Sequence, residues 1–320
     1  MTLVAAPSTV SVVICAYTER RWSDLVAAVE SVAAQSRRPD EIIVVVDHNE
    51  ALRQRAVALL PQAVVLPNEF EQGLSGGRNT AIAHATGAAI AFLDDDAVAA
   101  PDWLATLLDP FTSAHVAVVG GSARPDWDGG RPVWFPEEFD WVVGCTHRGV
   151  PETRTEVRNV IGCNMAFRRS VLAARGSFRT GLGRVGTLPV GCEETELCIR
   201  IRQADPDARV ILEPAAGVRH HVTHERRTVR YFLARNYSEG RSKAMVAALV
   251  GSSDAMATER AYAGRVLPAA VGRGLAGPLR GDFGGPLRSL AVVGGLGAFA
   301  IGYARAEISR RASTKRRAAS

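Results

Sequence analysis

The sequence lacks the cysteine pattern of a disulfide-bonded or zinc-binding protein. Its 320 residues include five cysteines, an odd number, and no two of them have the spacing of a metal-ligand pair. Small secreted domains depend on paired cysteines, whereas a reducing compartment leaves them free. The chain also has no basic segment followed by a long apolar run at its start, so no signal peptide is evident. We therefore expect a cytoplasmic protein.

The sequence also lacks a disorder signature and a common nucleotide-binding fingerprint. It is 47% hydrophobic and 22% charged, and its length suits one large domain with an appendage. The segment 73–78, Gly-Leu-Ser-Gly-Gly-Arg, has neither the Gly-Lys-Ser/Thr ending of a Walker loop nor dinucleotide-type glycine spacing. It is either a loop that caps a helix from 78 to 85 or a backbone that approaches a ligand, with Arg78 facing a phosphate.

What the sequence does contain is an alternation of strand-like runs and segments with helical spacing. Four apolar runs have the length and β-branched content of buried strands, at 10–17, 41–47, 63–66 and 88–93. Short alternation of this kind predicts an α/β fold, with a mainly parallel sheet and helices on both faces. Ligands of such sheets bind beyond the carboxyl ends of the strands.

Three of these runs end in polar side chains that we expect to converge at that edge. Tyr17 follows the first run, Asp47 the second and Asp94–Asp96 the fourth. Three adjacent carboxylates repel one another, so a partly buried triplet favours a shared cation. A divalent ion that takes oxygen ligands and leaves positions free for phosphate oxygens meets that need. For the triplet alone, a solvated acidic turn is the alternative.

The second half of the chain adds acidic groups at the start of an expected helix. This helix begins at about Glu193, and its first turn holds Glu193, Glu194 and Glu196. Carboxylates in a first turn also complement the helix dipole, so dipole compensation explains any one of them without a catalytic role.

Three histidines follow a short strand that is expected at 210–214. They are His220, His221 and His224. Each is either an ordinary surface-loop residue or, beside an acidic metal site, an imidazole ligand.

Two further segments have unusual compositions. Residues 125–155 combine tryptophans and prolines with acidic residues, and they either pack against one another as a flap or line a site for a flat ring such as a sugar. Residues 289–304 carry no charge but fall short of the ~20 residues of a spanning helix. Because basic residues follow from Arg305, we expect a re-entrant or interfacial helix whose basic tail lies against anionic head groups. Residues 286–320 would then contact the inner face of the cell membrane peripherally. A buried or oligomer-forming helix is the alternative.

The order of these parts resembles the family 2 glycosyltransferases with the GT-A fold, inverting enzymes that use nucleotide-sugar donors. The segments that carry the resemblance span roughly 9–245. They are 12–17, 43–47, 73–81, 92–96, 193–197 and His220. The resemblance implies a Rossmann-like, mixed but mainly parallel sheet over 9–245, with a donor half at about 9–120 and an acceptor half at about 121–245. The remainder, 246–320, is expected to be a helical appendage.

The resemblance also implies roles for individual residues. The donor-binding residues are Tyr17, Glu19, Asp47, Gly76, Arg78, Asn79, Asp94 and Asp95. The ligands of Mn²⁺ or Mg²⁺ are Asp96, Asp94 and His220. Glu194 is the general base, with Glu193 beside it. The family usually has Asp at this position, and the longer side chain of Glu allows either residue to act as the base. The donor is a nucleotide sugar, most commonly a UDP-sugar in this family, and the acceptor supplies a hydroxyl.

The residue types agree with such a reaction, and they leave two alternatives. A leaving diphosphate needs a cation, and an acceptor hydroxyl needs a carboxylate to take its proton. A sugar nucleotidyltransferase would need a glycine-rich loop and a lysine after the first strand, and Cys15–Glu19 offers neither. A non-catalytic membrane-associated scaffold is the second alternative. No nucleic-acid recognition module is evident, so no nucleic-acid partner is expected.

Overall fold

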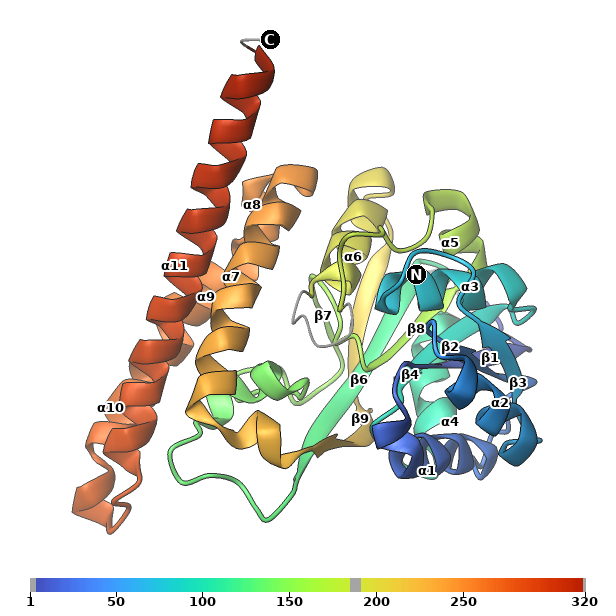
Figure 1. Cartoon of the computed structure of the whole chain (residues 1–320), viewed down its shortest axis with the longest axis horizontal. Helices are drawn as coiled ribbons and strands as arrows, with labels where there is room; N and C mark the ends of the chain where they lie inside the picture. Colours follow the sequence, from blue (N-terminus) through green and yellow to red (C-terminus); the bar gives the residue numbers. More distant parts are fainter. Residues whose placement is uncertain (1–3, 185–190, 319–320) are drawn as a thin grey trace.

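The computed structural model describes residues 4–184 and 191–318. In these ranges one mixed sheet runs through the molecule in the order β3-β2-β1-β4-β8-β6-β9-β5, with β7 on β9 (Figure 1). The strands are β1 (Val10–Ala16), β2 (Glu41–Val46), β3 (Val64–Pro67), β4 (Ala89–Asp94), β5 (Ala97–Ala99), β6 (Val116–Trp127), β7 (Thr155–Glu156), β8 (Asn164–Arg168) and β9 (Arg209–Val222). The glycine-rich segment at 181–191 lies largely outside the described residues.

The amino-terminal part of the sheet is parallel, as the alternation of strands and helices predicts. Strand β1 pairs in parallel with β2 on one side and with β4 on the other, and β2 pairs with β3. The chain order therefore reverses at β1, and a crevice opens beyond the carboxyl ends of β1 and β4. Strand β8 runs antiparallel to both β4 and β6, which makes the whole sheet mixed.

Helices cover both faces of the sheet, each through an apolar face of its own. One core packs α1 (Trp22–Ala33), α2 (Glu50–Leu59) and α4 (Trp103–Leu108) against the sheet. The other core packs α3 (Leu74–His84), α5 (Arg169–Arg175) and α6 (Glu193–Ala204) against the opposite face. Burial of these apolar side chains is the main term that holds the layers together.

The glycine segment at 73–78 is part of helix α3 rather than a loop before it. The helix begins at Leu74, because Gly73 adopts a φ of 129° that ends the preceding extended chain. At Gly76 a Cβ atom would stand 2.0 Å from the carbonyl oxygen of Glu71, so only glycine fits this close approach. The expected start at residue 78 is therefore wrong by one turn.

Strand β9 is much longer than the strand expected at 210–214, and it carries the histidines. It pairs in parallel with β6 as far as Trp127 and antiparallel with β5, where Ala97 faces His220. Pairing on both sides satisfies the backbone groups of residues that a sequence pattern assigns to a loop. His220 and His221 thus lie in the sheet next to the aspartate turn.

The carboxyl-terminal helices form a layer beside the sheet, at the side opposite α1 and α2 (Figure 1). They are α7 (Val229–Val250), α8 (Ser252–Ala255), α9 (Ala257–Ala261), α10 (Leu267–Leu275) and α11 (Gly285–Ala318). The expected division after residue 245 falls inside α7. Helices α7 and α11 pack closely, since a Cβ at Gly302 would lie 2.0 Å from the carbonyl oxygen of Tyr237.

Most aromatic residues of the 125–155 segment pack against these helices. Phe135 is fully buried and makes edge contacts with Trp127 and with Phe232 of α7. Trp134 also meets Phe232, at 5.5 Å between ring centroids. Packing is thus the role of these rings, and Trp141 alone among the tryptophans of the described residues lines the central cavity.

Candidate functional site

One cavity of about 720 Å³ lies beyond the carboxyl ends of β1, β2 and β4. Its wall includes Tyr17 after β1, Asp47 after β2 and Asp94–Asp96 at the end of β4. The lining also includes Glu194 at the start of α6, and His220 of β9, which lies next to Asp96. The fold thus brings both halves of the expected site to a single cavity, because all these residues follow strand ends or pack against them.

Asp96 is held by two arginines and a histidine at the wall of the cavity. Its Oδ1 lies 3.0 Å from Nε2 of His220, and its Oδ2 lies 3.1 Å from Nη2 of Arg226 and 3.1 Å from Nη1 of Arg21. Burial raises the pKa of the Asp96 carboxyl, but His220, Arg226 and Arg21 outweigh burial and hold this pKa well below its usual range. Asp96 is therefore a carboxylate at neutral pH.

Its neighbour Asp95 has the opposite electrostatic character. Burial raises the pKa of its carboxyl to about 7, although Arg21 donates a hydrogen bond to Oδ1 at 2.9 Å. The other oxygen, Oδ2, is buried without a hydrogen-bond partner among the described residues. A buried carboxylate oxygen without a partner is costly, which makes this edge of the cavity receptive to a ligand.

Asp94, Asp96 and His220 have the arrangement and the chemistry of a divalent-cation site. One ligand atom from each lies within 4.8 Å of the others. Asp94 is the most open of the three, with 30% of its side chain exposed, and the Nδ1 atom of His220 is buried without a partner among the described residues. Two carboxylates with one imidazole suit Mn²⁺, and carboxylates suit Mg²⁺. The residues therefore fit the ion that the resemblance implies.

Arg78 lines the cavity, but its guanidinium is almost fully buried and is bonded to other groups of the protein. Its side chain is 2% exposed and donates to Oε1 of Glu193 at 2.8 Å and to the carbonyl oxygen of Gly162 at 2.8 Å. It also lies 3.4 Å from Oδ1 of Asp94. Phe92 and Phe178 flank the guanidinium, at 5.8 and 5.2 Å from the ring centroids. Arg78 thus links the aspartate turn to the start of α6.

Glu193 and Glu194 are adjacent but have different surroundings. Both line the cavity, but Glu193 is 4% exposed and paired with Arg78. Glu194 is half-buried and accepts a hydrogen bond from Thr195 Oγ1 at 3.2 Å. Burial, together with the charge of Glu193, raises the pKa of Glu194 to about 7. A carboxylate with a pKa near the working pH is the better proton acceptor, and this favours Glu194 over Glu193 as a general base.

The remaining residues expected to bind the donor fall into two groups. Tyr17 and Asp47 line the cavity, and Asp47 accepts hydrogen bonds from Asn68 Nδ2 and the Gly73 amide. Glu19, Gly76 and Asn79 do not line it. Glu19 is exposed on a 3₁₀ turn, and Gly76 lies in the closely packed part of α3. The side-chain amide of Asn79 donates a hydrogen bond to the carbonyl oxygen of Phe178 and accepts one from its backbone amide.

Comparison with known proteins decides the family. The family model described as glycosyl transferase family 2 matches residues 11–176. The chain is 39% identical over 238 residues to a glucosyl-dolichyl phosphate glucuronosyltransferase of Haloferax volcanii, covering 73% of this chain and 76% of the relative. The chain belongs to glycosyltransferase family 2. This family 2 member is also 25% identical to the succinoglycan biosynthesis protein ExoM of Rhizobium meliloti, over 72% of each chain.

Solved structures show the same architecture. The mannosyltransferase PcManGT of Pyrobaculum calidifontis, in complex with GDP-Man and Mn²⁺, aligns with a TM-score of 0.56 at 19% identity, over 92% of this chain and 89% of that one. GalNAc-T7 with UDP, GalNAc and Mn²⁺ aligns with a TM-score of 0.53 at 20% identity, over 74% and 51%. The glycosyltransferase therefore has the expected GT-A fold.

Sequence reasoning missed two cationic groups of this glycosyltransferase. Arg21 and Arg226 meet the aspartates from a 3₁₀ turn after β1 and from a 3₁₀ turn before α7. Arginines are common on surfaces, so no spacing singles these two out. Only their burial, at 15% and 7% exposure of the side chains, marks them.

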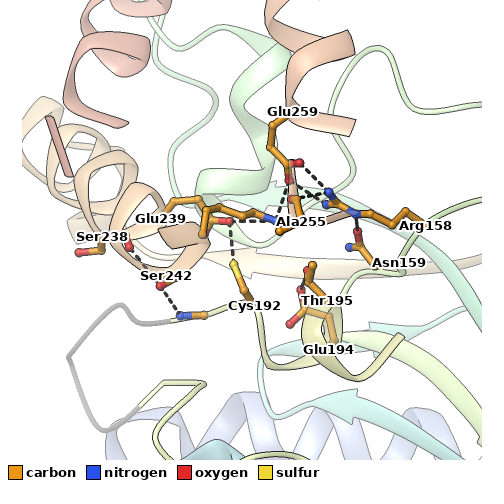
Figure 2. A network of polar contacts seen from close by, with 12 residues as sticks. Arg158, Asn159, Cys192, Glu194, Thr195, Ser238, Glu239, Ser242, Ala255 and Glu259 are labelled. Carbon is orange, nitrogen blue, oxygen red and sulfur yellow. Dashed lines mark hydrogen bonds and ion pairs between the residues drawn. The ribbon is translucent and has the colours of Figure 1, made fainter. Parts of the chain in front are cut away.

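A buried charge network at the far wall was also missed. Arg158 makes a two-pronged ion pair with Glu259 of α9, at 2.6 and 2.7 Å, and Lys243 of α7 lies 2.7 Å from the same carboxylate. Glu239 of α7 accepts a hydrogen bond from the Cys192 thiol at 3.0 Å. Figure 2 shows this network beside Glu194 and Thr195. It ties the carboxyl-terminal helices to the start of α6.

Proposed function

We propose that the protein transfers a sugar, with inversion, from a nucleoside-diphosphate donor to an acceptor hydroxyl. Asp94, Asp96 and His220 hold a divalent cation, and Glu194 is the general base. The single observation that carries the proposal is that the aspartate turn and Glu194 face one cavity. Family membership favours glycosyl transfer over the nucleotidyltransferase and scaffold alternatives. Both solved structures are complexes with Mn²⁺ and a nucleotide or nucleotide sugar, which supports the cation.

The side chains divide the reaction between them. The acceptor oxygen forms a bond to the anomeric carbon, the bond from that carbon to the diphosphate oxygen breaks, and Glu194 takes the hydroxyl proton. The cation, when bound, neutralises charge on the departing diphosphate. Arg78 neutralises Glu193, so that only one carboxylate of the pair competes for the proton. We assign the base and ribose of a UDP-sugar to the part of the cavity that Tyr17 and Asp47 line.

Donor binding measured with and without metal, together with one substitution at Asp96 and a control substitution at another aspartate, tests this proposal. Thermal-shift screening of UDP- and GDP-sugars should give a stabilising donor only with Mn²⁺ or Mg²⁺, because a divalent cation would offset the repulsion between the aspartates and a diphosphate. Asp96→Asn should abolish release of nucleoside diphosphate, whereas Asp102→Asn, an exposed residue before α4, should leave it unchanged. Metal-independent turnover, or full turnover by folded Asp96→Asn protein, would refute the proposal.

The carboxyl-terminal helices support a place at a membrane surface. In the described residues one helix, over Gly285–Ala312, is long and apolar enough to cross a membrane by length and composition. The hairpin between α10 and α11 exposes Leu279, at 91%, and Phe283, at 79%, beside Arg280. Exposed apolar tips with cations suit the interface of an anionic bilayer. The name of the Haloferax relative, which includes a dolichyl phosphate, supports the same location.

A further inference from the structure

The cavity has two ends of opposite charge. At the end formed by β1, β2, β4 and α3, the acidic groups outnumber the three arginines Arg21, Arg78 and Arg226, which suits a divalent cation. The end formed by α6, α7, α9 and the segments beside them has the opposite balance. Among the described residues that line it, the carboxylates are Glu193, which is paired with Arg78, Glu194, Glu239 and Glu259. The cations that line this second end are Arg158, Arg184, Arg235, Lys243, Arg260 and Arg265.

The excess of cations at the second end persists after its internal ion pairs are counted. Glu259 pairs with Arg158 (Figure 2) and also with Lys243. Glu239 pairs with Arg235 at 2.7 Å and with Lys243 at 3.7 Å. Three buried cations thus share two carboxylates. Burying charge without a counter-charge is costly, so such a wall calls for an anionic ligand.

Two more cations stand at the rim of this end. Arg260 and Arg265 are exposed, and within residues 4–184 and 191–318 neither of them makes an ion pair. Long-range attraction by such a rim raises the local concentration of an anion before it reaches the buried cluster.

Beyond the cations, the same cavity continues between apolar side chains. Val266 and Leu267 line it from the start of α10, and Leu296 and Phe299 line it from α11. Tyr262 adds a ring next to them. Helix α11, the one helix of the described residues with the length and composition to cross a membrane, thus contributes to the wall of the cavity that holds Glu194. This arm suits a hydrocarbon chain.

We propose that the acceptor is a lipid phosphate: a hydroxyl-bearing group joined through a phosphate to a long hydrocarbon chain. The hydroxyl meets Glu194, the phosphate meets the cluster around Lys243 and Arg235, and the chain lies in the apolar arm. This rests on the proposed function, since the hydroxyl that Glu194 deprotonates is the one that takes the sugar. No bond to the phosphate of the acceptor forms or breaks in that step.

Calorimetric titration of the full chain with farnesyl phosphate tests the site without a turnover assay. Farnesyl phosphate should bind at least about tenfold tighter than either farnesol or inorganic phosphate, because each of these offers only one of the two contacts. If inorganic phosphate binds as tightly as farnesyl phosphate, the hydrocarbon chain does not bind in the apolar arm. If farnesol binds as tightly, the phosphate does not bind at the cluster around Lys243 and Arg235. Either result overturns the proposal.

Matched variants locate the two contacts. Lys243→Met should weaken farnesyl phosphate binding about tenfold, and Arg230→Gln, an exposed cation of α7 outside the cavity, should not. Arg260→Gln combined with Arg265→Gln keeps the test valid if Lys243→Met fails to fold, since both lie at the exposed rim. On α11, Leu296→Gln should weaken binding, whereas Leu290→Gln, 70% exposed and outside the cavity, should not. Unchanged affinity in the folded Leu296 and rim variants would overturn the proposal.

The two proposals fail separately. If Mn²⁺-dependent donor turnover is present but farnesyl phosphate does not bind, the acceptor inference is overturned and the proposed function stands. If farnesyl phosphate binds with the expected pattern but no donor is turned over, the lipid phosphate site is supported and the proposed function is not.

Discussion

Arg78 and Glu193 form a buried ion pair, with 2.8 Å between Nη1 and Oε1, across the boundary between the two halves of the sheet. The two side chains are 2% and 5% exposed. Because Arg78 also contacts Asp94 and Gly162, it fixes the aspartate turn relative to the start of α6. The pair engages Glu193 and leaves Glu194 as the more exposed of the two glutamates that line the cavity.

The two glutamates should therefore respond differently to the same substitution. Glu194→Gln should remove sugar transfer by at least about a hundredfold while sparing binding of the nucleotide, because it deletes only the proton acceptor. Transfer rate and nucleotide affinity, measured on the same protein, check this. If Glu194→Gln retains transfer, Glu194 is not the base.

Glu193→Gln is the matched comparison. It leaves the Arg78 guanidinium buried with less compensation, so the free energy of unfolding should fall by about 3 kcal/mol. Chemical denaturation measures that loss. A stable Glu193→Gln protein that has lost transfer would reverse the assignment of the two roles.

The rate of transfer should depend on pH through Glu194. Burial and Glu193 raise the pKa of its carboxyl to about 7, so the protonated form, which cannot accept a proton, accumulates below that pH. The rate of transfer should fall about tenfold for each pH unit below 7. A rate that stays constant down to pH 5 in the folded protein would contradict a general base with this pKa.

The free energy of unfolding should also depend on pH through the Glu194 carboxyl. The rise in pH that speeds transfer should lower the stability of the fold. The folded protein holds the Glu194 proton up to about pH 7, whereas the pKa of an unperturbed glutamate is 4.5. Stability therefore falls as pH rises from 4.5 to 7, because the folded state binds more protons in that window. Glu194→Gln should raise the free energy of unfolding at pH 8 by up to about 3 kcal/mol. The gain should vanish near pH 4, and a gain that is the same at both pH values would exclude this cause.

The packing of α11 on α7 should depend on particular glycines. Gly302→Ala places a methyl group against the Tyr237 carbonyl, so it should lower the free energy of unfolding by about 1–3 kcal/mol. Gly297 on the same helix has no neighbouring atom within 4 Å of the place that a methyl group would take, and Gly297→Ala should stabilise the protein by up to about 1 kcal/mol. Thermal denaturation of both variants checks the contrast. Equal effects would show that the helices do not pack at Gly302.

The hairpin between α10 and α11 should mediate contact with membranes. Replacing Leu279 and Phe283 by Glu should lower flotation with phosphatidylglycerol-containing vesicles, because both side chains are exposed and apolar. Val57→Glu, exposed on α2, is the control. Truncation before Pro286 is a weaker test, since it removes the helix that packs on α7. Flotation that is the same for the hairpin variant, the control and the unsubstituted protein would exclude the hairpin as the contact.

The sequence by itself determined the amino-terminal architecture. The β-branched runs and their polar ends predict the parallel strands β1, β2 and β4 and the edge where Tyr17, Asp47 and Asp94–Asp96 meet, because strand length and burial are local properties of a run. The helix that starts at Glu193 was predicted for the same reason, from its periodicity and its acidic first turn.

Only the tertiary structure decided which charged groups face one another. Arg21, Arg226 and Lys243 have no distinguishing spacing. They matter because other elements of the fold bring the two arginines to the aspartates and Lys243 to Glu259. The extension of β9 to His220 likewise depends on pairing with β6 and β5. Ion pairs and strand pairing join distant residues, and the energy of such contacts has no signature in the local pattern from which a sequence is read.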